Sequence, residues 1–285
     1  MLKDYTWLHV EPTTRCNAWC PSCPRNKQGF GLADFVVEDL DVKTLQATIN
    51  KLPAIKTVQM CGNLGDPCAA KNIDKLLQVI VDNKSITRLQ LHTNGSLRKP
   101  SWWRSLVEKF SYLHQFDIIF AIDGLEDTHS IYRQATNWNT IIKNAQAFID
   151  LGGSAVWQFI PFEHNKHQIM DCVRLSQELG FRRFEFVRDA RYKKENRHWQ
   201  TGNPIDIKPW KEYNKFSKWA INYKDYVKRS NCMHLELSSV FLSASGVISP
   251  CCYMAGTPLN GISINNEFNN KTYRNVCLKS CGSKY

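Results

Sequence analysis

The stretch that most constrains this chain is Glu11–Arg25, which reads EPTTRCNAWCPSCPR and contains Cys16, Cys20 and Cys23. The three cysteines have C-x3-C-x2-C spacing and directly follow an apolar, β-prone run from Tyr5 to Val10. Three thiolates on one short loop can hold three corners of a four-iron cube, a cluster type that normally takes four cysteine thiolates. The fourth iron would then stay open, and an open metal position is where chemistry takes place.

A zinc knuckle is the alternative for this loop. Zinc sites usually pair C-x2-C with a second pair of ligands. Here the third cysteine lies upstream of Cys20 and Cys23, at Cys16, so the spacing favours the iron–sulfur interpretation.

The composition places the chain among globular proteins. Its 285 residues suffice for one large domain and a small appendage. No apolar run approaches the roughly 18 residues that a membrane span needs, and the N-terminus shows no secretion signal. Eleven cysteines in a chain without an export signal therefore indicate metal ligation rather than a disulfide framework. We expect a cytoplasmic protein that does not enter a membrane.

Basic residues concentrate between Arg182 and Arg197, in a chain whose formal net charge is +11. Such a run can meet a substrate that carries phosphate or carboxylate, and nucleic acid is another partner of the same charge. No aromatic-interleaved RNA module is recognisable, so a solvated linker face is the favoured interpretation. Within the run, Arg188 follows a predicted strand and could meet a carboxylate with its planar fork.

The order of apolar and polar residues predicts strands that alternate with amphipathic helices, which is typical of a parallel α/β fold. Strands are expected over 5–11, 57–61, 88–92, 117–122, 155–160 and 183–187, and helices over 41–51, 72–83, 100–110, 139–150 and 167–179. Six β/α units are too few to close an eight-fold barrel. In barrels of this kind the sites lie at the C-terminal ends of the strands. In this chain the cysteine loop and the segments rich in Gly, Asn and Asp directly follow predicted strands.

These features together resemble the radical S-adenosylmethionine (AdoMet) enzymes, whose hallmark is C-x3-C-x2-C on the loop after the first barrel strand. The resemblance implies an open, TIM-like (β/α)6 partial barrel over residues 1–200 and a [4Fe–4S] cluster on Cys16, Cys20 and Cys23. AdoMet would chelate the fourth iron through its amino and carboxylate groups. One electron, from a flavodoxin- or ferredoxin-type donor, would cleave it to methionine and a 5′-deoxyadenosyl radical that abstracts a substrate hydrogen.

Segments after three further strands add to the resemblance. They read Cys61-Gly62-Asn63-Leu64-Gly65-Asp66-Pro67, His92-Thr93-Asn94-Gly95 and Ala121-Ile122-Asp123-Gly124. The first is similar to the family's glycine-rich segment, whose backbone and acidic residue receive the AdoMet amino group, although Asp66 stands where the family usually has glutamate. The resemblance makes these residues candidate AdoMet contacts: Gly62, Gly65, Asp66, Asn94, Asp123 and Gln158. A capping or turn role is the alternative for each.

The C-terminal part, residues 201–285, contains a lone cysteine, then Gly246-x4-Cys251, then a late cysteine pair. This framework resembles the SPASM/twitch extension of radical AdoMet enzymes, a small α+β domain. The resemblance implies an auxiliary [4Fe–4S] cluster suited to electron transfer, with these ligands: Cys232, Cys251, Cys277 and Cys281. Cys252 could replace Cys251, and a zinc site would need the same four thiolates.

Relatives with such extensions oxidise alcohols or thiols, or form new bonds in peptides. The resemblance therefore implies dehydrogenation of a small molecule or modification of a peptide. The first predicted strand begins by residue 5, which mildly disfavours a leader-peptide-guided enzyme. The alternatives are an RNA-modifying enzyme, a non-catalytic iron–sulfur electron carrier and a zinc-stapled binding protein.

Overall fold

The computed structural model describes residues 4–26, 31–189, 191, 194–210, 234, 237–256 and 258–259. Six parallel strands lie side by side in chain order: β1 (Trp7–Val10), β2 (Thr57–Met60), β3 (Arg88–Thr93), β4 (Gln115–Ala121), β5 (Ser154–Phe159) and β6 (Arg183–Phe186). Five helices join them: α1 (Val42–Asn50), α2 (Ile73–Asp82), α3 (Pro100–Lys109), α5 (Trp138–Ile149) and α6 (Ile169–Glu178). The predicted α/β fold with a parallel sheet is confirmed.

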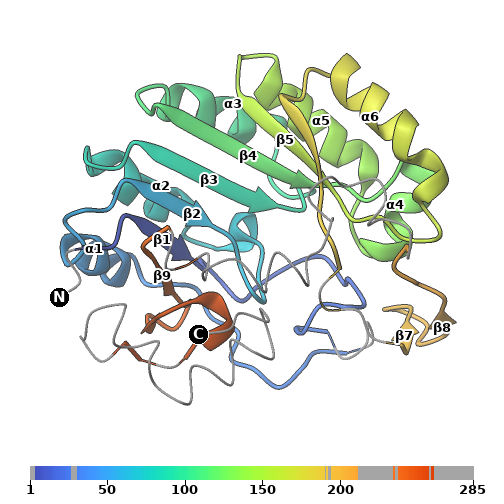
Figure 1. Ribbon diagram of the computed structural model, residues 1–285, viewed down its shortest axis with the longest axis horizontal. Coiled ribbons are helices and arrows are strands. Elements are labelled where there is room, and N and C mark those ends of the chain that lie inside the picture. The colour runs from blue at the N-terminus through green and yellow to red at the C-terminus, as the bar shows by residue number, and fades with distance from the viewer. Residues whose placement is uncertain are drawn as a thin grey trace.

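The helices pack along one face of the curved sheet, which is twisted across the molecule (Figure 1). The core lies between the two layers, and each of the first five strands contributes a fully buried side chain to it: Leu8, Val58, Leu89, Ile118 and Trp157. The strands alternate between this core and the opposite face: β3 buries Leu89 and Leu91, whereas Gln90 and His92 are half-buried. No helix in the described part of the chain combines the length and the apolar character that a membrane crossing needs.

Local chemistry explains where several helices begin. The Asp41 side chain accepts a hydrogen bond from the Thr44 backbone N–H at 2.9 Å and caps α1. The Asn137 side chain does the same for α5, and Pro100 occupies the first turn of α3, where no backbone donor is needed. These caps fix the helix starts, and with them the lengths of the loops that precede the helices.

Helix α4 (Glu126–Tyr132) was not predicted from the sequence. It is seven residues long and polar, with Thr128, His129 and Tyr132 on its buried side. A segment this short gives no apolar period, because most of its buried side chains are themselves polar. The helix matters for the site, since the residue that follows it is Arg133.

The C-terminal strands extend the same sheet. Strand β9 (Ser239–Leu242) is completely buried and pairs in parallel with β1, and β10 (Ile248–Ser249) pairs antiparallel with β9. The sheet therefore has the order β10-β9-β1-β2-β3-β4-β5-β6, with β9 beside β1 (Figure 1). The C-terminal part of the chain therefore adds two strands to the sheet beyond β1. The domain boundary after residue 200 stays a prediction, and β9 beyond it belongs to the sheet of the barrel strands.

Candidate functional site

A cavity of about 350 Å³ opens at the C-terminal ends of the parallel strands. Residues that follow or end each of β1 to β6 line it, as the fold class requires. Among the predicted site residues, those that line the cavity are Cys16, Cys20, Cys23, Gly62, Gly65, Asp66, Asn94 and Gln158. The structure therefore brings together residues that are spread over more than 140 positions of the sequence.

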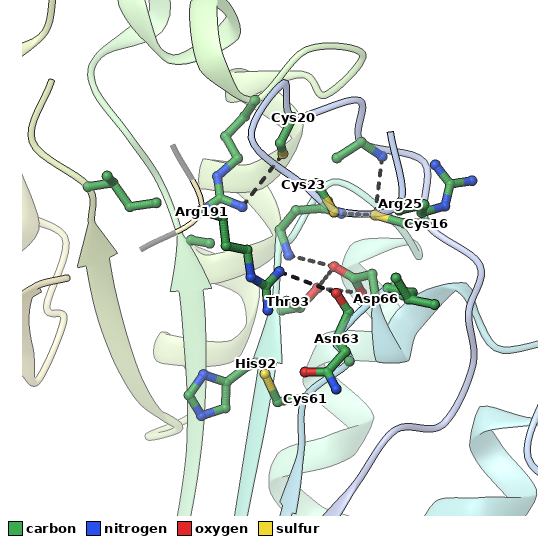
Figure 2. A pocket seen from close by; sticks show the side chains of 18 of the residues that line it. Cys16, Cys20, Cys23, Arg25, Cys61, Asn63, Asp66, His92, Thr93 and Arg191 are labelled. Atoms are coloured by element: carbon green, nitrogen blue, oxygen red, sulfur yellow. Dashed lines mark hydrogen bonds between the residues drawn. The ribbon is translucent and has the colours of Figure 1, made fainter. Parts of the chain in front are cut away.

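The three thiols of the cysteine loop face this cavity (Figure 2). The Ala18 backbone N–H points at Cys16 Sγ at 3.4 Å, and Asn94 Nδ2 approaches the same sulfur at 3.8 Å. Arg133 Nη1 lies 3.8 Å from Cys20 Sγ. Burial raises the pKa of Cys20 to about 11, and the nearby Arg133 guanidinium opposes this rise. Donors aimed at sulfur stabilise the thiolate form, which is the form that ligates metal.

This donor set fits an iron–sulfur cube better than a single ion. One zinc ion would need its thiolates about 2.3 Å from a common centre. Among the described residues, no three His, Cys, Asp or Glu side chains are gathered closely enough to hold one metal ion. Three thiols on one wall of a cavity can each serve a different iron of a cube, so Cys16, Cys20 and Cys23 suit that group.

The two glycines of the second loop are needed for packing. A Cβ atom at Gly65 would lie 1.8 Å from the carbonyl oxygen of Thr13, and one at Gly62 would lie 2.3 Å from the carbonyl oxygen of Gly65. The Asp66 backbone N–H donates to the Arg15 carbonyl oxygen at 2.8 Å across the same junction. Gly65 therefore allows this loop to lie directly against the cysteine loop, whereas Gly62 allows a close approach within the loop itself.

Asp66 connects the loops after β2 and β3. Its two carboxylate oxygens accept hydrogen bonds from the Thr93 hydroxyl at 3.0 Å, the Asn94 backbone N–H at 2.6 Å and the Cys68 backbone N–H at 2.9 Å. Burial raises the pKa of Asp66, and these donors oppose the rise. The carboxylate also lines the cavity (Figure 2), so it can serve both the protein and a ligand.

Asn94 and Gln158 reach the cavity in different ways. The Asn94 side chain is held by the cysteine loop, because its Nδ2 donates to Asn17 Oδ1 at 2.9 Å, while its Oδ1 accepts from the Ser96 backbone at 3.0 Å. Gln158 lies near the end of β5 and is half-buried. Its side chain makes no hydrogen bond to any residue in the described part of the chain, which leaves its amide available to a ligand.

Asp123 does not line the cavity, unlike the other predicted contacts. Its side chain is fully buried and its oxygens accept hydrogen bonds from Arg133 Nε and from the Ile160 backbone N–H, both at 2.6 Å. Arg133 itself lines the cavity and approaches Cys20. The structure thus places Asp123 behind Arg133, as its counter-charge, and adds Arg133 to the site.

The arginines of the basic run that begins at Arg182 lie in different surroundings. Arg182 pairs with the buried Asp117 at 2.9 Å, whereas Arg188 and Arg191 are exposed at the rim of the cavity and line it. Arg191 Nη1 also donates to the Asn63 carbonyl oxygen at 3.2 Å. Asp189 also lines the cavity, so acidic and basic side chains lie together at this rim, and both arginines are exposed to solvent.

His92, at the end of β3, also lines the cavity and was not predicted as a site residue. Trp7 Nε1 donates to Gln59 Oε1 at 3.2 Å, so Gln59 must donate from Nε2 to His92 Nε2, which lies 3.1 Å away. The His92 hydrogen then resides on Nδ1. Burial lowers the pKa of His92 to about 4, which makes it a neutral imidazole at physiological pH.

Of the four cysteines assigned to an auxiliary cluster, only Cys251 falls within the described residues; Cys232, Cys277 and Cys281 lie outside them. Cys251 is buried against Met254. Its neighbour Cys252 is partly exposed, and the Cys252 carbonyl oxygen accepts a hydrogen bond from Asn63 Nδ2 at 2.8 Å. This contact brings the Cys251–Cys252 segment to the loop after β2, at the edge of the cavity.

No protein-family model and no curated protein matches this chain. Solved structures resemble it in fold. Streptococcus suis SuiB bound to S-adenosylmethionine is 15% identical, with 96% of this chain and 68% of that chain covered and a TM-score of 0.64. The protein anSMEcpe with bound AdoMet is also 15% identical, with 95% of this chain and 83% of that chain covered and a TM-score of 0.67. The structure of anSMEcpe with AdoMet and the Kp18Cys peptide gives 14% identity, coverages of 95% and 82%, and a TM-score of 0.64. At such identities the likeness shows the fold alone.

Proposed function

We propose that this chain is a radical AdoMet enzyme. The observation that carries the proposal is the set of three thiols, Cys16, Cys20 and Cys23, which line one cavity at the carboxyl ends of a parallel sheet. The fold neighbours are radical AdoMet enzymes, and SuiB and anSMEcpe have AdoMet bound, which supports the same assignment here. When bound, a [4Fe–4S] cluster and AdoMet supply reductive cleavage to a 5′-deoxyadenosyl radical.

The chain's own residues would position these groups. Asp66 offers a buried carboxylate to the AdoMet ammonium, and Asn94 and Gln158 offer amide groups from two other strand ends. Arg133 stands beside Cys20, where its positive charge favours the thiolate. Asp123 keeps that arginine in place with a 2.6 Å ion pair. Gly65 lets the loop that carries Asp66 lie against the cysteine loop, and Gly62 lets that loop fold closely onto its own residue Gly65.

The substrate remains a peptide or a small molecule in this proposal. The fold neighbours favour a peptide, because SuiB was solved with its precursor peptide SuiA and anSMEcpe with the Kp18Cys peptide. Arg188 and Arg191, which line the cavity together with Asp189, favour a substrate that carries a carboxylate. Hydrogen abstraction would then lead to oxidation or to formation of a new bond.

The auxiliary cluster is part of the same proposal. Cys232, Cys251, Cys277 and Cys281 would ligate it, and it would accept the second substrate electron. The contact between Asn63 and Cys252 supports this arrangement, because it joins the segment of Cys251 to the edge of the cavity. An electron leaving the substrate would therefore have a short distance to travel.

The test is anaerobic purification and reconstitution, followed by iron and sulfide analysis and an assay of 5′-deoxyadenosine with dithionite and AdoMet. We expect about eight irons per chain with AdoMet cleavage, and about four irons without cleavage in the Cys16/Cys20/Cys23 triple-alanine variant. Cys172→Ala is the matched control, since this cysteine is buried in α6 outside the cavity.

Two other results would change the proposal. About four irons plus one zinc in the wild type would keep the radical enzyme and replace the auxiliary cluster with a zinc site. Iron without any AdoMet cleavage would favour the non-catalytic electron carrier.

A further inference from the structure

A second cavity, of about 550 Å³, lies beside the first. Two residues, Cys16 and Arg25, line both cavities and so form part of the wall between them. The strand-end residues Asp66, Asn94 and Gln158 line the first cavity and do not line the second. A molecule in the second cavity would therefore contact a cluster-ligating cysteine from outside the substrate site.

The second cavity is positively charged. Arg15, Arg25 and Arg98 line it, and none of the described lining residues is acidic, although Asp39 outside the lining pairs with Arg15 Nε at 3.2 Å. Arg98 donates to the carbonyl oxygens of Cys68 and Ala70 at 2.8 and 2.7 Å, which are neutral acceptors that leave its charge uncompensated.

Arg25 is the most deeply buried of the three arginines. It is only 7% exposed, and its Nε has no partner in the described part of the chain. Its Nη1 donates to Asn26 Oδ1 at 3.1 Å and its guanidinium lies 5.4 Å from the centre of the Trp19 ring, so among the described residues its charge is not paired with a carboxylate.

Exposed apolar side chains border the same cavity. Leu32 and Val37 line it and are 39% and 44% exposed, and the adjacent Val36 is 69% exposed. The Thr14 hydroxyl donates to the Val36 carbonyl oxygen at 2.9 Å, which ties this segment to the cysteine loop. Apolar side chains surrounded by arginines are the usual composition of a protein-docking surface.

We propose that this docking surface, defined by Arg15, Arg25, Leu32, Val37 and Arg98, binds a small acidic redox protein that carries a flavin or an iron–sulfur centre. The inference rests on the proposed function, which requires one electron for each AdoMet cleaved. The reduced donor loses one electron and the cluster gains it, with Cys16 as the ligand nearest to the donor. Acidic carboxylates on the donor would complement Arg25 and Arg98, whereas Arg15 already pairs with Asp39. Entry from this side leaves the substrate cavity closed to the donor.

The first test measures binding directly. Flavodoxin and ferredoxin, each labelled with a fluorophore, are titrated with the reconstituted protein at low ionic strength. In the Leu32→Glu/Val37→Glu variant both new charges lie on exposed positions, so the fold is kept, and we expect the Kd to rise by about tenfold or more. Lys143→Glu, on the exposed face of α5, is the matched control and should bind as the wild type does.

The second test compares two sources of electrons. With flavodoxin and its NADPH-dependent reductase, formation of 5′-deoxyadenosine should fall about tenfold or more in the docking-surface variants. With dithionite, which needs no docking, it should stay at the wild-type rate. Rising salt should slow only the flavodoxin-driven reaction.

Several results would overturn the proposal. They are wild-type binding in the variants, a parallel loss with both reductants, or no binding of either carrier to the wild type. Variants that change the sedimentation of the protein alone would instead indicate a contact between two copies of this chain. If the proposed function is wrong, the wild type will form no 5′-deoxyadenosine with dithionite. The binding titrations do not depend on that reaction and would still test whether the docking surface binds the donor.

Discussion

Replacing Gly65 with alanine should test why the loop after β2 contains a glycine at this position. The new Cβ would lie 1.8 Å from the Thr13 carbonyl oxygen, 2.6 Å from the Thr13 carbonyl carbon and 2.9 Å from the Arg15 carbonyl oxygen. All three are backbone atoms, so no change of side-chain rotamer can relieve the clash. The loop must therefore move away from the cysteine loop by more than about 1 Å.

The energetic cost follows from what that movement breaks. The hydrogen bond from the Asp66 backbone N–H to the Arg15 carbonyl oxygen is 2.8 Å long and crosses the same junction. Losing it leaves a buried donor unsatisfied, at about 1–3 kcal/mol, and overpacking adds about 1–3 kcal/mol. We expect the free energy of unfolding to fall by roughly 2–6 kcal/mol. A domain with about 5–15 kcal/mol of stability would remain folded in most of that range.

The assay combines urea unfolding of the cluster-free protein with iron analysis after reconstitution, before any AdoMet is added. Gly65→Ala should lower both the urea midpoint and the iron content. Gly152→Ala is the control, because its Cβ would meet nothing within 4 Å and only its φ of +84° disfavours alanine. Its free energy of unfolding should fall by about 1–2 kcal/mol, and its iron content should equal that of the wild type. If Gly65→Ala unfolds like the wild type, keeps its iron and loses only AdoMet affinity, the packing explanation is wrong.

Three further perturbations test the surroundings of the cysteine loop. Arg133→Met leaves the fully buried Asp123 carboxylate without its partner and should lower the free energy of unfolding in urea by about 3–5 kcal/mol. The Arg133→Met/Asp123→Asn double variant should recover part of that loss. A double variant as unstable as Arg133→Met alone would contradict the ion-pair argument. Burial lowers the pKa of His129 to about 3, so below pH 6.5 the unfolded chain binds a proton that the folded chain does not. His129 should therefore contribute about 2 kcal/mol to the fall in the free energy of unfolding between pH 6.5 and 5. A His129→Gln variant with the same pH slope as the wild type would refute this assignment. Trp199→Ala removes the ring stacked on Trp19 of the cysteine loop at 5.7 Å; it should cost about 0.5–1.5 kcal/mol and speed iron release to a chelator, and unchanged release would show that the stack does not support the loop.

The barrel strands could be predicted because their signal is local. The predicted strand at 155–160 is observed as β5 at 154–159, and the other five differ from the structure by similar amounts. The partner of β9 could not be predicted in this way. It pairs with β1, more than 200 residues earlier, and an apolar run specifies that a strand is buried without specifying its neighbour.

The site residues also differ in whether a local sequence signal identifies them. The cysteine spacing and the loop segments after the strands could be found by inspection, because they are contiguous in the sequence. Arg133 could not be found in this way. Arg133 joins Asp123 to Cys20, which is 113 residues away, and its place depends on the unpredicted helix α4. The role of His92 could not be predicted from its turn motif either. Its neutral state depends on burial and its hydrogen bond on Gln59, which lies on a different strand.

Asp66 shows how the departure from glutamate can be accommodated. A carboxylate offers about four lone-pair sites. Three donors already reach Asp66: the Thr93 hydroxyl, which has one hydrogen to share between the two oxygens, and the backbone N–H groups of Asn94 and Cys68. One site then remains for an AdoMet ammonium in the cavity.

Asp66→Asn tests this count directly. An amide of the same shape removes the negative charge and turns an NH2 group towards backbone donors, so stability and AdoMet affinity should fall together. Because a hydrogen bond to a charged group contributes about 1.5–3 kcal/mol, we expect the AdoMet Kd of the reconstituted protein to rise roughly 10- to 100-fold, measured by equilibrium dialysis. Asp82→Asn, on the outer end of α2, is the matched control. An Asp66→Asn variant that loses stability but binds AdoMet as the wild type does would show that this carboxylate serves the loops alone.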